Sequence, residues 1–297
     1  MKILVTGSNG LLGQHLVKLL LEKEYHVIAL GKGVDRLSFS PNPLYKYVDA
    51  DITDANAIEN LMADETPDII IHAAAMTQVD ICEQEKEKCY DINVNGTKII
   101  TTLAEKNKIF LIFISTDFVF DGEKGNYKEE DELKPVNFYG STKMDAEKII
   151  LDSETTYSII RTCLVYGNVL QGTRSNIISW VKEKLEKREK IKVVDDQVRT
   201  PTYIEDLTKG ILFVIEKKAT GIFHISGEEV LTPYQMAIQL ADFFGLDKNL
   251  VERVNASTFS QPAKRPMKTG FNINKAKTIL NYQPISFKEG LQKMYKE

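Results

Sequence analysis

The stretch that decides the fold is residues 6–13, TGSNGLLG, near the start of the 297-residue chain. It follows an apolar run at 2–6 (KILVT), which we expect to be a buried strand, and it opens a helix-like segment at 10–22. Gly7 permits a tight turn, Gly10 lets the backbone approach a pyrophosphate, and Gly13 allows close packing of helix on sheet. A strand-to-helix turn alone also favours glycine, but this placement favours a dinucleotide site. The expected contacts of this loop are Gly7, Asn9, Gly10, Leu11 and Leu12.

Composition and charge exclude several classes of protein. Apolar residues make up 43% of the chain, and 38 Lys+Arg against 42 Asp+Glu give a net charge of -4. A mildly acidic chain lacks the basic surface of a nucleic-acid-binding protein. No apolar run reaches the roughly 18 residues of a membrane span, and the first one is too short for a secretory signal. Three scattered cysteines form no disulfide framework. We therefore expect a cytoplasmic protein with neither nucleic-acid nor membrane partners.

Short apolar runs alternate with helix-length segments through the first half of the chain. The expected strands are 2–6, 26–30, 45–48, 69–72, 109–114 and 157–161, and the expected helices are 10–22, 54–63, 83–106 and 141–151. Strands that are apolar on both faces and separated by helices indicate an α/β fold with a Rossmann-like, doubly wound parallel sheet.

The regular alternation of apolar runs and helix-length segments ends at about residue 165. Beyond it we expect helices at 176–188, 205–217 and 233–244 and strands at 191–194 and 222–225. We expect a dinucleotide-binding domain at 1–165, to which 203–225 returns. A smaller C-terminal substrate-binding lobe, interleaved with it, is expected at 166–297.

The end of the second strand indicates which dinucleotide is bound. An acidic residue there would bind the ribose 2'-hydroxyl of NAD, but the chain has Lys32 between two glycines. Lys32 suits a 2'-phosphate, so we favour NADP(H), with NAD(H) as a second cofactor; the alternative is a solvated loop lysine. Asp51 and Ile52 are placed to contact adenine, although Asp51 is nearly as well explained as a plain loop residue.

The fourth strand ends in His72 and three alanines, Ala73, Ala74 and Ala75. Small residues there let the backbone approach the cofactor ribose. His72 is expected to be a buried strand histidine rather than a catalyst.

Tyr139 and Lys143 are four residues apart at the start of a helix and so share one of its faces. A nearby ammonium lowers the pKa of a phenol, which can then exchange a proton with a carbonyl or alcohol. Ser115 and Thr116 end the fifth strand, at the edge where such sheets bind ligands, and either hydroxyl could bond the reacting oxygen. The alternative makes Thr116 a strand-end cap and Tyr139 a packing residue.

Four ordered blocks accompany these residues: STDFVFDG at 115–122, RTCLVYG at 161–167, DQVRTPT at 196–202, and Arg265-Pro266. With them the chain resembles the extended short-chain dehydrogenase/reductase superfamily and, more narrowly, the dTDP-4-dehydrorhamnose reductases, almost end to end. The resemblance implies that NADPH delivers hydride to C4 of a 4-keto deoxyhexose attached to dTDP. It also implies that Tyr139 donates the proton, Thr116 polarises the keto oxygen and Lys143 orients the ribose.

Three departures from the family pattern concern the expected sugar pocket. Phe118 replaces a Tyr, Leu164 a Trp and Arg199 a Gly, and we expect all three to be substrate-binding residues. They leave open which sugar and which nucleotide are bound.

The second lobe supplies candidate contacts for a nucleotide-sugar diphosphate. Arg174 and Asn176 precede a helix, while Arg199 and Arg265 add positive charge to an acidic chain. For each arginine alone, a surface salt bridge is the simpler explanation.

Some family members form a metal-linked dimer built on carboxylates, one of them just after the glycine loop. This chain has Gln14 and His15 there, so we expect no metal, and we expect His15 to be exposed. A homodimer without metal stays open.

Two other functions fit the same fold. A sugar-nucleotide dehydratase usually has Asp-Glu after the catalytic Thr, whereas Thr116 is followed by Asp117 and Phe118; an epimerase stays open. A non-catalytic, NADP-binding regulatory module is the second alternative, because the regulatory subunit of methionine adenosyltransferase shares the resemblance. The combination of Thr116, Tyr139 and Lys143 favours an enzyme.

Overall fold

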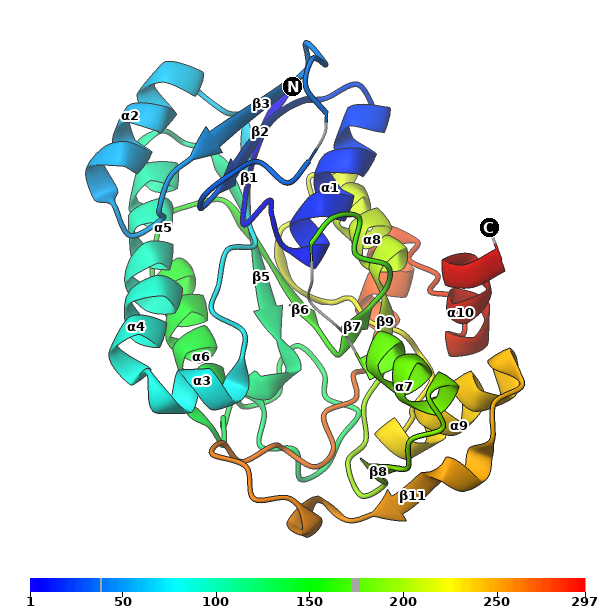
Figure 1. Ribbon diagram of the computed structural model, residues 1–297. Coiled ribbons are helices and arrows are strands. Elements are labelled where there is room, and N and C mark those ends of the chain that lie inside the picture. Colours follow the sequence, from blue (N-terminus) through cyan, green and yellow to red (C-terminus); the bar gives the residue numbers. More distant parts are fainter. Residues whose placement is uncertain (38, 173–176, 297) are drawn as a thin grey trace.

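Seven parallel strands form the central sheet of the computed structural model, which describes residues 1–37, 39–172 and 177–296. The strand order is β10-β6-β5-β4-β1-β2-β3 (Figure 1). The strands are β1 (Lys2–Thr6), β2 (His26–Gly31), β3 (Tyr45–Asp49), β4 (Ile69–His72), β5 (Phe110–Thr116), β6 (Tyr157–Thr162) and β10 (Gly221–His224). The order reverses at β1, next to β4, so the crevice between these two strands is where ligands bind in such sheets.

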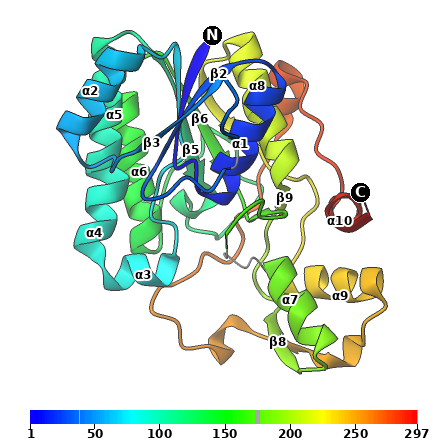
Figure 2. The ribbon, with the colours of Figure 1, turned by 45° about the horizontal axis from the view of Figure 1, so that its top comes forward.

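Helices cover both faces of the sheet (Figures 1 and 2). One face packs against α1 (Leu11–Glu22) and α8 (Ile204–Lys217), and the other against α2 (Ala55–Glu65), α5 (Gly96–Lys106) and α6 (Phe138–Leu151). Strands β1 and β4 are buried along almost their full length, as both-sided cover requires. The Rossmann-like, doubly wound fold expected from the sequence is confirmed.

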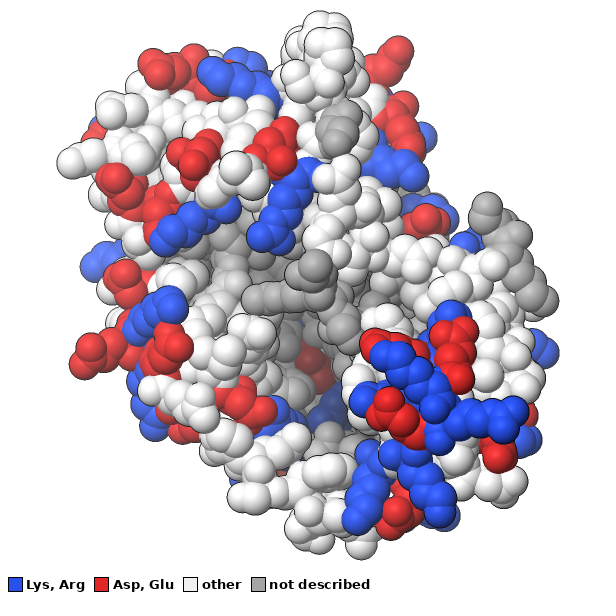
Figure 3. Space-filling view, viewed as in Figure 1, with Lys and Arg blue, Asp and Glu red and all other residues white. Residues whose placement is uncertain are grey.

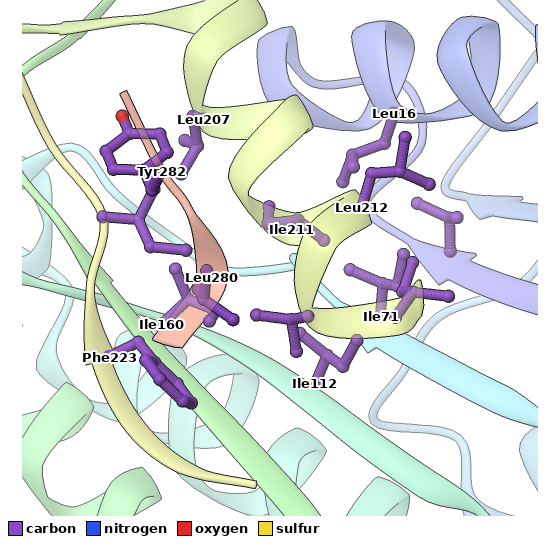
Figure 4. Packing of buried hydrophobic residues seen from close by; sticks show 14 of the residues in the cluster. Leu16, Ile71, Ile112, Ile160, Leu207, Ile211, Leu212, Phe223, Leu280 and Tyr282 are labelled. Carbon is purple, nitrogen blue, oxygen red and sulfur yellow. The ribbon is translucent and has the colours of Figure 1, made fainter. Parts of the chain in front are cut away.

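The core on the α1 and α8 face joins residues that are distant in the sequence. Leu16 of α1 and Leu212 of α8 pack over Ile71 and Ile112 of the sheet (Figure 4). Near the β6 edge, Leu280 from the C-terminal segment packs into the same cluster. Each such buried side chain contributes roughly 1.5–3 kcal/mol relative to exposure. The C-terminal segment is therefore part of the core that packs on the central sheet.

Helix starts follow their capping residues. The Asp54 carboxylate accepts a hydrogen bond from the Ala57 amide at 3.0 Å and caps the start of α2. The Asn137 side chain caps α6 through the Gly140 amide at 2.8 Å. Helix α6 therefore begins at Phe138, three residues before the expected start at 141.

The region expected to be helical at 83–106 is helical except at Glu85, but it is not one uniform α-helix. It divides into α3 (Val79–Gln84), α4 (Lys86–Tyr90), a π-helical turn η1 (Asp91–Asn95) and α5.

The second lobe lies below the carboxyl edge of the sheet (Figure 2). Its core joins α7 (Ile177–Glu186) and α9 (Pro233–Phe244) to the parallel pair β8 (Ile191–Val194) and β11 (Val251–Val254). The remaining elements are α10 (Phe287–Lys296), β7 (Val165–Tyr166), β9 (Thr202–Tyr203), the short turns η2 (Asp117–Val119), η3 (Lys248–Leu250) and η4 (Ala256–Thr258), and the π turn η5 (Ala276–Leu280). Strand β10 leaves this lobe and pairs with β6. The division at residue 165 stays a prediction.

The face in Figure 3 is hollowed between the two lobes, and charges of both signs gather over α7 and β8. Lys182 pairs with Glu186 and Lys187 with Glu183, both at 2.6 Å, so this charge run is a solvated helix face. Among the described helices, none combines the length and hydropathy that crossing a membrane would need.

Candidate active site

The carboxyl ends of β1, β4 and β5 meet at one edge of the sheet, and the glycine loop fits tightly there. Gly7 has φ +71°, and a Cβ on it would lie 2.8 Å from the Ala74 backbone at the end of β4. A Cβ on Gly13 would lie 2.3 Å from the Gly7 carbonyl oxygen. Both positions therefore require glycine, and the turn they form sets the start of α1 against the sheet.

The start of α1 suits an anion. Its N-cap is Gly10, which has no side chain to occupy the free amides, and the first turn holds no acidic residue. In the described part of the chain, the buried Ser8 hydroxyl has no hydrogen-bond partner. Free amides and the positive end of the helix dipole bind phosphate groups. The free amides of Leu11 and Leu12 are therefore placed to hold a dinucleotide pyrophosphate, whereas the Gly10 amide already donates to the Gly7 carbonyl at 2.9 Å.

Asn9 shapes the neighbouring loop instead of lying free. Its Nδ2 donates to the Val34 carbonyl at 3.1 Å and to the Tyr47 hydroxyl at 3.0 Å, and its Oδ1 accepts from the Arg36 amide at 3.1 Å. Asn9 thus holds the segment after β2 in place.

Lys32 and Asp51, each expected to contact the cofactor, lie side by side. The Lys32 Nζ is 2.7 Å from the Asp51 Oδ2, and the hydrogen bond from Lys32 holds the pKa of Asp51 below its usual value. Ile52 is buried and packs against Gly96 of α5, where a Cβ would lie 2.8 Å from the Ile52 Cδ1. Lys32 and Asp51 thus meet just beyond the carboxyl ends of β2 and β3.

His72 belongs to the core, as expected. Its Nδ1 lies 2.8 Å from the Thr6 hydroxyl and its Nε2 lies 3.1 Å from the Thr97 hydroxyl. Burial lowers the pKa of His72 to about 3, with Lys143 adding to the effect, so the ring is neutral. Thr6 also accepts from the Ala74 amide at 3.1 Å, which fixes the alanine segment beside the glycine loop.

Thr116, Tyr139 and Lys143 converge at the end of β5. Tyr139 and Lys143 are buried on one face of α6, and the Thr116 hydroxyl forms a hydrogen bond with the Tyr139 phenol. The Lys143 Nζ lies 3.9 Å from the ring centroid of Phe113, and Phe118 packs edge-on against Tyr139 with ring centroids 6.0 Å apart. The three groups named from the sequence therefore form one cluster.

Burial shifts the proton affinities of this cluster. It raises the pKa of Tyr139, and the hydrogen bond from Thr116 opposes the shift. It lowers the pKa of Lys143 to about 7, against the attraction of the Glu147 carboxylate and of Cys89. In the described residues Lys143 has no hydrogen-bond acceptor, so its amine is available to a ligand's hydroxyl groups.

Asp117 was not predicted to be a site residue, but its carboxylate binds the Thr116 hydroxyl. It accepts a hydrogen bond from the Thr116 hydroxyl at 3.1 Å, from the Cys163 thiol at 3.2 Å and from the Thr269 hydroxyl. Burial raises the pKa of Asp117, and Arg199 opposes this. The signal in the sequence is a carboxylate directly after an apolar strand, because a buried carboxylate is stable only where hydrogen-bond donors surround it.

Asn93 is a second residue that was missed. Its Oδ1 accepts from the Met76 amide at 2.8 Å, and its Nδ2 donates to the Thr142 hydroxyl at 3.0 Å. It joins the loop after β4 to α6, beside Tyr139 and Lys143. An amide in a helical segment carries no periodic signal, so only the packing identifies it.

The expected substrate residues have different environments. Phe118 is half-buried beside Tyr139, and Leu164 is half-buried with φ +38°, a conformation that is strained for a leucine. Arg199 is buried, and its terminal nitrogens donate to the Val198, Pro266 and Met267 carbonyls at 2.8–3.1 Å. Arg174 and Asn176 lie outside the described residues.

Arg265 forms an ion pair rather than lying open. Its two terminal nitrogens contact the Asp80 carboxylate of α3 at 2.5 Å, and Asp80 also accepts from the Ala263 amide at 3.1 Å. This ion pair holds the segment just before Lys268 against α3; Lys268 itself pairs with Val198 in an isolated β-bridge. The diphosphate role of Arg199 and Arg265 stays a prediction.

The expectation that His15 is exposed is wrong. His15 is buried, and its Nε2 donates to the Asn168 carbonyl at 2.7 Å. Its neighbour Gln14 donates to the Asn9 carbonyl at 3.0 Å and to the Gln171 carbonyl at 2.6 Å. The start of α1 therefore holds residues 168–171, the loop that leads into the second lobe, in place.

Comparisons with known proteins agree with this geometry. The family model described as the RmlD substrate binding domain matches residues 1–297. The chain is 30% identical to a dTDP-4-dehydrorhamnose reductase from Aggregatibacter actinomycetemcomitans, over 98% of this chain and 97% of that one. It is 31% identical to a methionine adenosyltransferase 2 subunit beta from Pongo abelii, over 98% and 86%. A dTDP-4-dehydrorhamnose reductase structure from Bacillus anthracis, in complex with NADP, matches with TM-score 0.87 and 28% identity, covering 99% of this chain and 98% of that one.

Proposed function

The chain belongs to the RmlD substrate binding domain family, and from this premise we propose that it reduces the 4-keto group of a nucleotide-linked deoxy sugar. The protein is an NAD(P)-dependent oxidoreductase, and the substrate we propose is dTDP-4-dehydrorhamnose, with dTDP-rhamnose as product. One observation supports this most directly: Thr116, Tyr139 and Lys143 cluster at the end of β5, on the same edge of the parallel sheet as the uncapped start of α1.

The cofactor is NADP(H), with NAD(H) as an alternative. The residues fit it: Gly7 and Gly13 shape the loop, and the first amides of α1 meet its phosphates. Lys143, buried and without an acceptor in the described residues, is placed to bind the ribose hydroxyls. When bound, the cofactor supplies the hydride for reduction at C4.

The protein's own residues handle the proton and the oxygen. Tyr139 donates its phenolic proton to the developing alkoxide. General acid catalysis of this kind raises the reaction rate by roughly 10²–10⁴-fold. Lys143, when protonated, makes the phenol more acidic and offsets the rise that burial causes. When the substrate binds, the Thr116 hydroxyl gives up its hydrogen bond to Asp117 and donates to the keto oxygen, which polarises it. The Phe118 amide, 3.3 Å away, holds the hydroxyl oxygen in place.

The decisive experiment is spectroscopic. NADPH and dTDP-4-keto-6-deoxy-L-mannose are mixed with the protein, and the absorbance of NADPH is followed. Oxidation that depends on both supports the proposal. If that sugar and other nucleotide-linked keto sugars all leave NADPH unchanged, the reductase proposal fails.

A binding role is the second candidate, because the methionine adenosyltransferase 2 subunit beta relative is as similar as the reductase relative. In that case the protein binds NADPH but turns over no keto sugar, and it alters the activity of a separate catalytic chain. A dehydratase is disfavoured because Phe118, packed on Tyr139, stands where an acid is needed.

A further inference from the structure

Glu147 is a buried carboxylate directly behind the catalytic cluster. It lies one helical turn after Lys143 on the same face of α6, and its side chain is 0% exposed. The Ser115 hydroxyl, from the residue before Thr116, donates to its Oε1 at 2.5 Å. Glu147 therefore contacts the end of β5 while belonging to the helix that carries Tyr139 and Lys143.

A second strand closes this contact. Arg161 of β6 donates from Nε to Oε1 at 3.0 Å and from Nη2 to Oε2 at 2.7 Å, and it is itself 2% exposed. The remaining guanidinium nitrogen donates to the Glu129 carbonyl at 3.1 Å. A carboxylate that accepts charge-assisted hydrogen bonds from two neighbouring strands is held in one orientation. It fixes α6 against β5 and β6.

The groups around Lys143 show what this carboxylate does. On its own helix Lys143 is influenced by Glu147, on α4 by Cys89, and on β4 by His72, which is neutral. On β5 it faces the ring of Phe113. Within the described residues, Glu147 is the carboxylate that favours the charged form of the amine.

We propose that Glu147 is a positioning residue of this reductase: its carboxylate, held by Ser115 and Arg161, places a negative charge one helical turn from Lys143 and fixes the helix of Tyr139 and Lys143 against the strand that ends in Thr116. The mechanistic part rests on the function proposed above, but the effect on Lys143 belongs to the protein alone. Arg161 and Ser115 act by orienting Glu147.

The test measures Lys143 without cofactor or substrate. Urea unfolding is followed from about pH 6 to about pH 9 for the wild-type chain and for the same chain carrying Lys143→Met. A buried lysine with a low pKa makes the unfolded state bind more protons, so stability rises with pH above that pKa. The difference between the two chains therefore reports the titration of Lys143.

The pair of measurements is then repeated in chains that carry Glu147→Gln. The midpoint of the Lys143 titration should then lie at least about one pH unit lower. Because Glu147→Gln leaves the Arg161 charge unpaired and could prevent folding, Glu147→Gln/Arg161→Met is the second variant; removing both charges avoids the unpaired ion. It should show the same downward shift. Glu59→Gln, which removes an exposed helix carboxylate paired with Lys106 at 2.8 Å, is the control and should leave the midpoint unchanged.

A folded double variant whose Lys143 midpoint equals that of the wild type would overturn the proposal. In active enzyme the same variants should move the alkaline limb of the kcat profile downward, whereas a merely structural role would lower stability and leave the profile in place. If the wild type reduces no keto sugar while the midpoint still shifts, the proposed function fails and the electrostatic role of Glu147 stands.

Discussion

Lys32, which follows β2, and Asp51, which follows β3, form an ion pair with 2.7 Å between Nζ and Oδ2. Each residue is expected to contact a different part of the cofactor, one the 2'-phosphate and the other the adenine. Their pairing means that a phosphate competes with a carboxylate for the same ammonium. We therefore expect the relative affinity for NADPH and NADH to depend on both residues together.

Lys32→Ala should weaken NADPH binding about threefold to tenfold and leave NADH binding nearly unchanged, because an exposed charge contact is a modest one. Asp51→Asn should act in the opposite direction on NADPH by freeing Lys32. Fluorescence titration of both cofactors measures this, with Lys106→Ala as a surface-lysine control. Equal losses for both cofactors in Lys32→Ala would remove Lys32 from the 2'-phosphate site.

Tyr139→Phe should lower kcat by about 10²–10⁴-fold while NADPH binding stays near the wild-type value, because only the proton donor is lost. Stopped-flow absorbance gives the rate, and cofactor titration gives the binding. Tyr90→Phe, at an exposed tyrosine of α4, is the matched control. Near-normal turnover by Tyr139→Phe would show that the proton comes from another group.

NADPH binding should take up about one proton near pH 8 and none from this group near pH 6. Burial lowers the pKa of Lys143 to about 7 in the free protein, and ribose hydroxyls that accept from the ammonium raise it again on binding. The dissociation constant should therefore rise with pH above about 7. Calorimetry in buffers of different ionisation enthalpy measures the uptake. Identical uptake by Lys143→Met would contradict the assignment.

Arg199→Ala should raise the KM for the nucleotide sugar far more than the KM for NADPH. It removes a buried guanidinium that holds the backbone of residues 266–267. It should also lower the free energy of unfolding by about 1–3 kcal/mol, because buried carbonyls lose their donors. Steady-state kinetics and urea titration separate the two effects. Equal changes in both KM values would place Arg199 outside the substrate site.

Local patterns predicted the frame of the molecule well. The apolar strands, the glycine spacing, and the Tyr139 and Lys143 pair are all short-range features, and the structure places them in the expected elements. The start of α6 was missed by three residues because the Asn137 cap decides it. Capping is local too, but a single polar residue is a weak signal beside a run of apolar ones.

Contacts between distant segments could not be predicted. His15 is buried because Asn168, 153 residues away, lies over it, and Arg265 meets Asp80 across 185 residues. The same holds for Glu147 and Arg161, whose pairing becomes apparent only when α6 and β6 are packed together. Periodicity reports which side of an element is apolar, not which charged residue finds a partner there.

The hydrogen bonds from Gln14 and His15 to the 168–171 loop have a practical consequence for engineering. A chimera that exchanges the second lobe with that of a relative would normally be cut near residue 165, which leaves both side chains with the old half and their acceptors with the new one. Such a hybrid should assemble properly only if the first turn of α1 is exchanged along with the lobe.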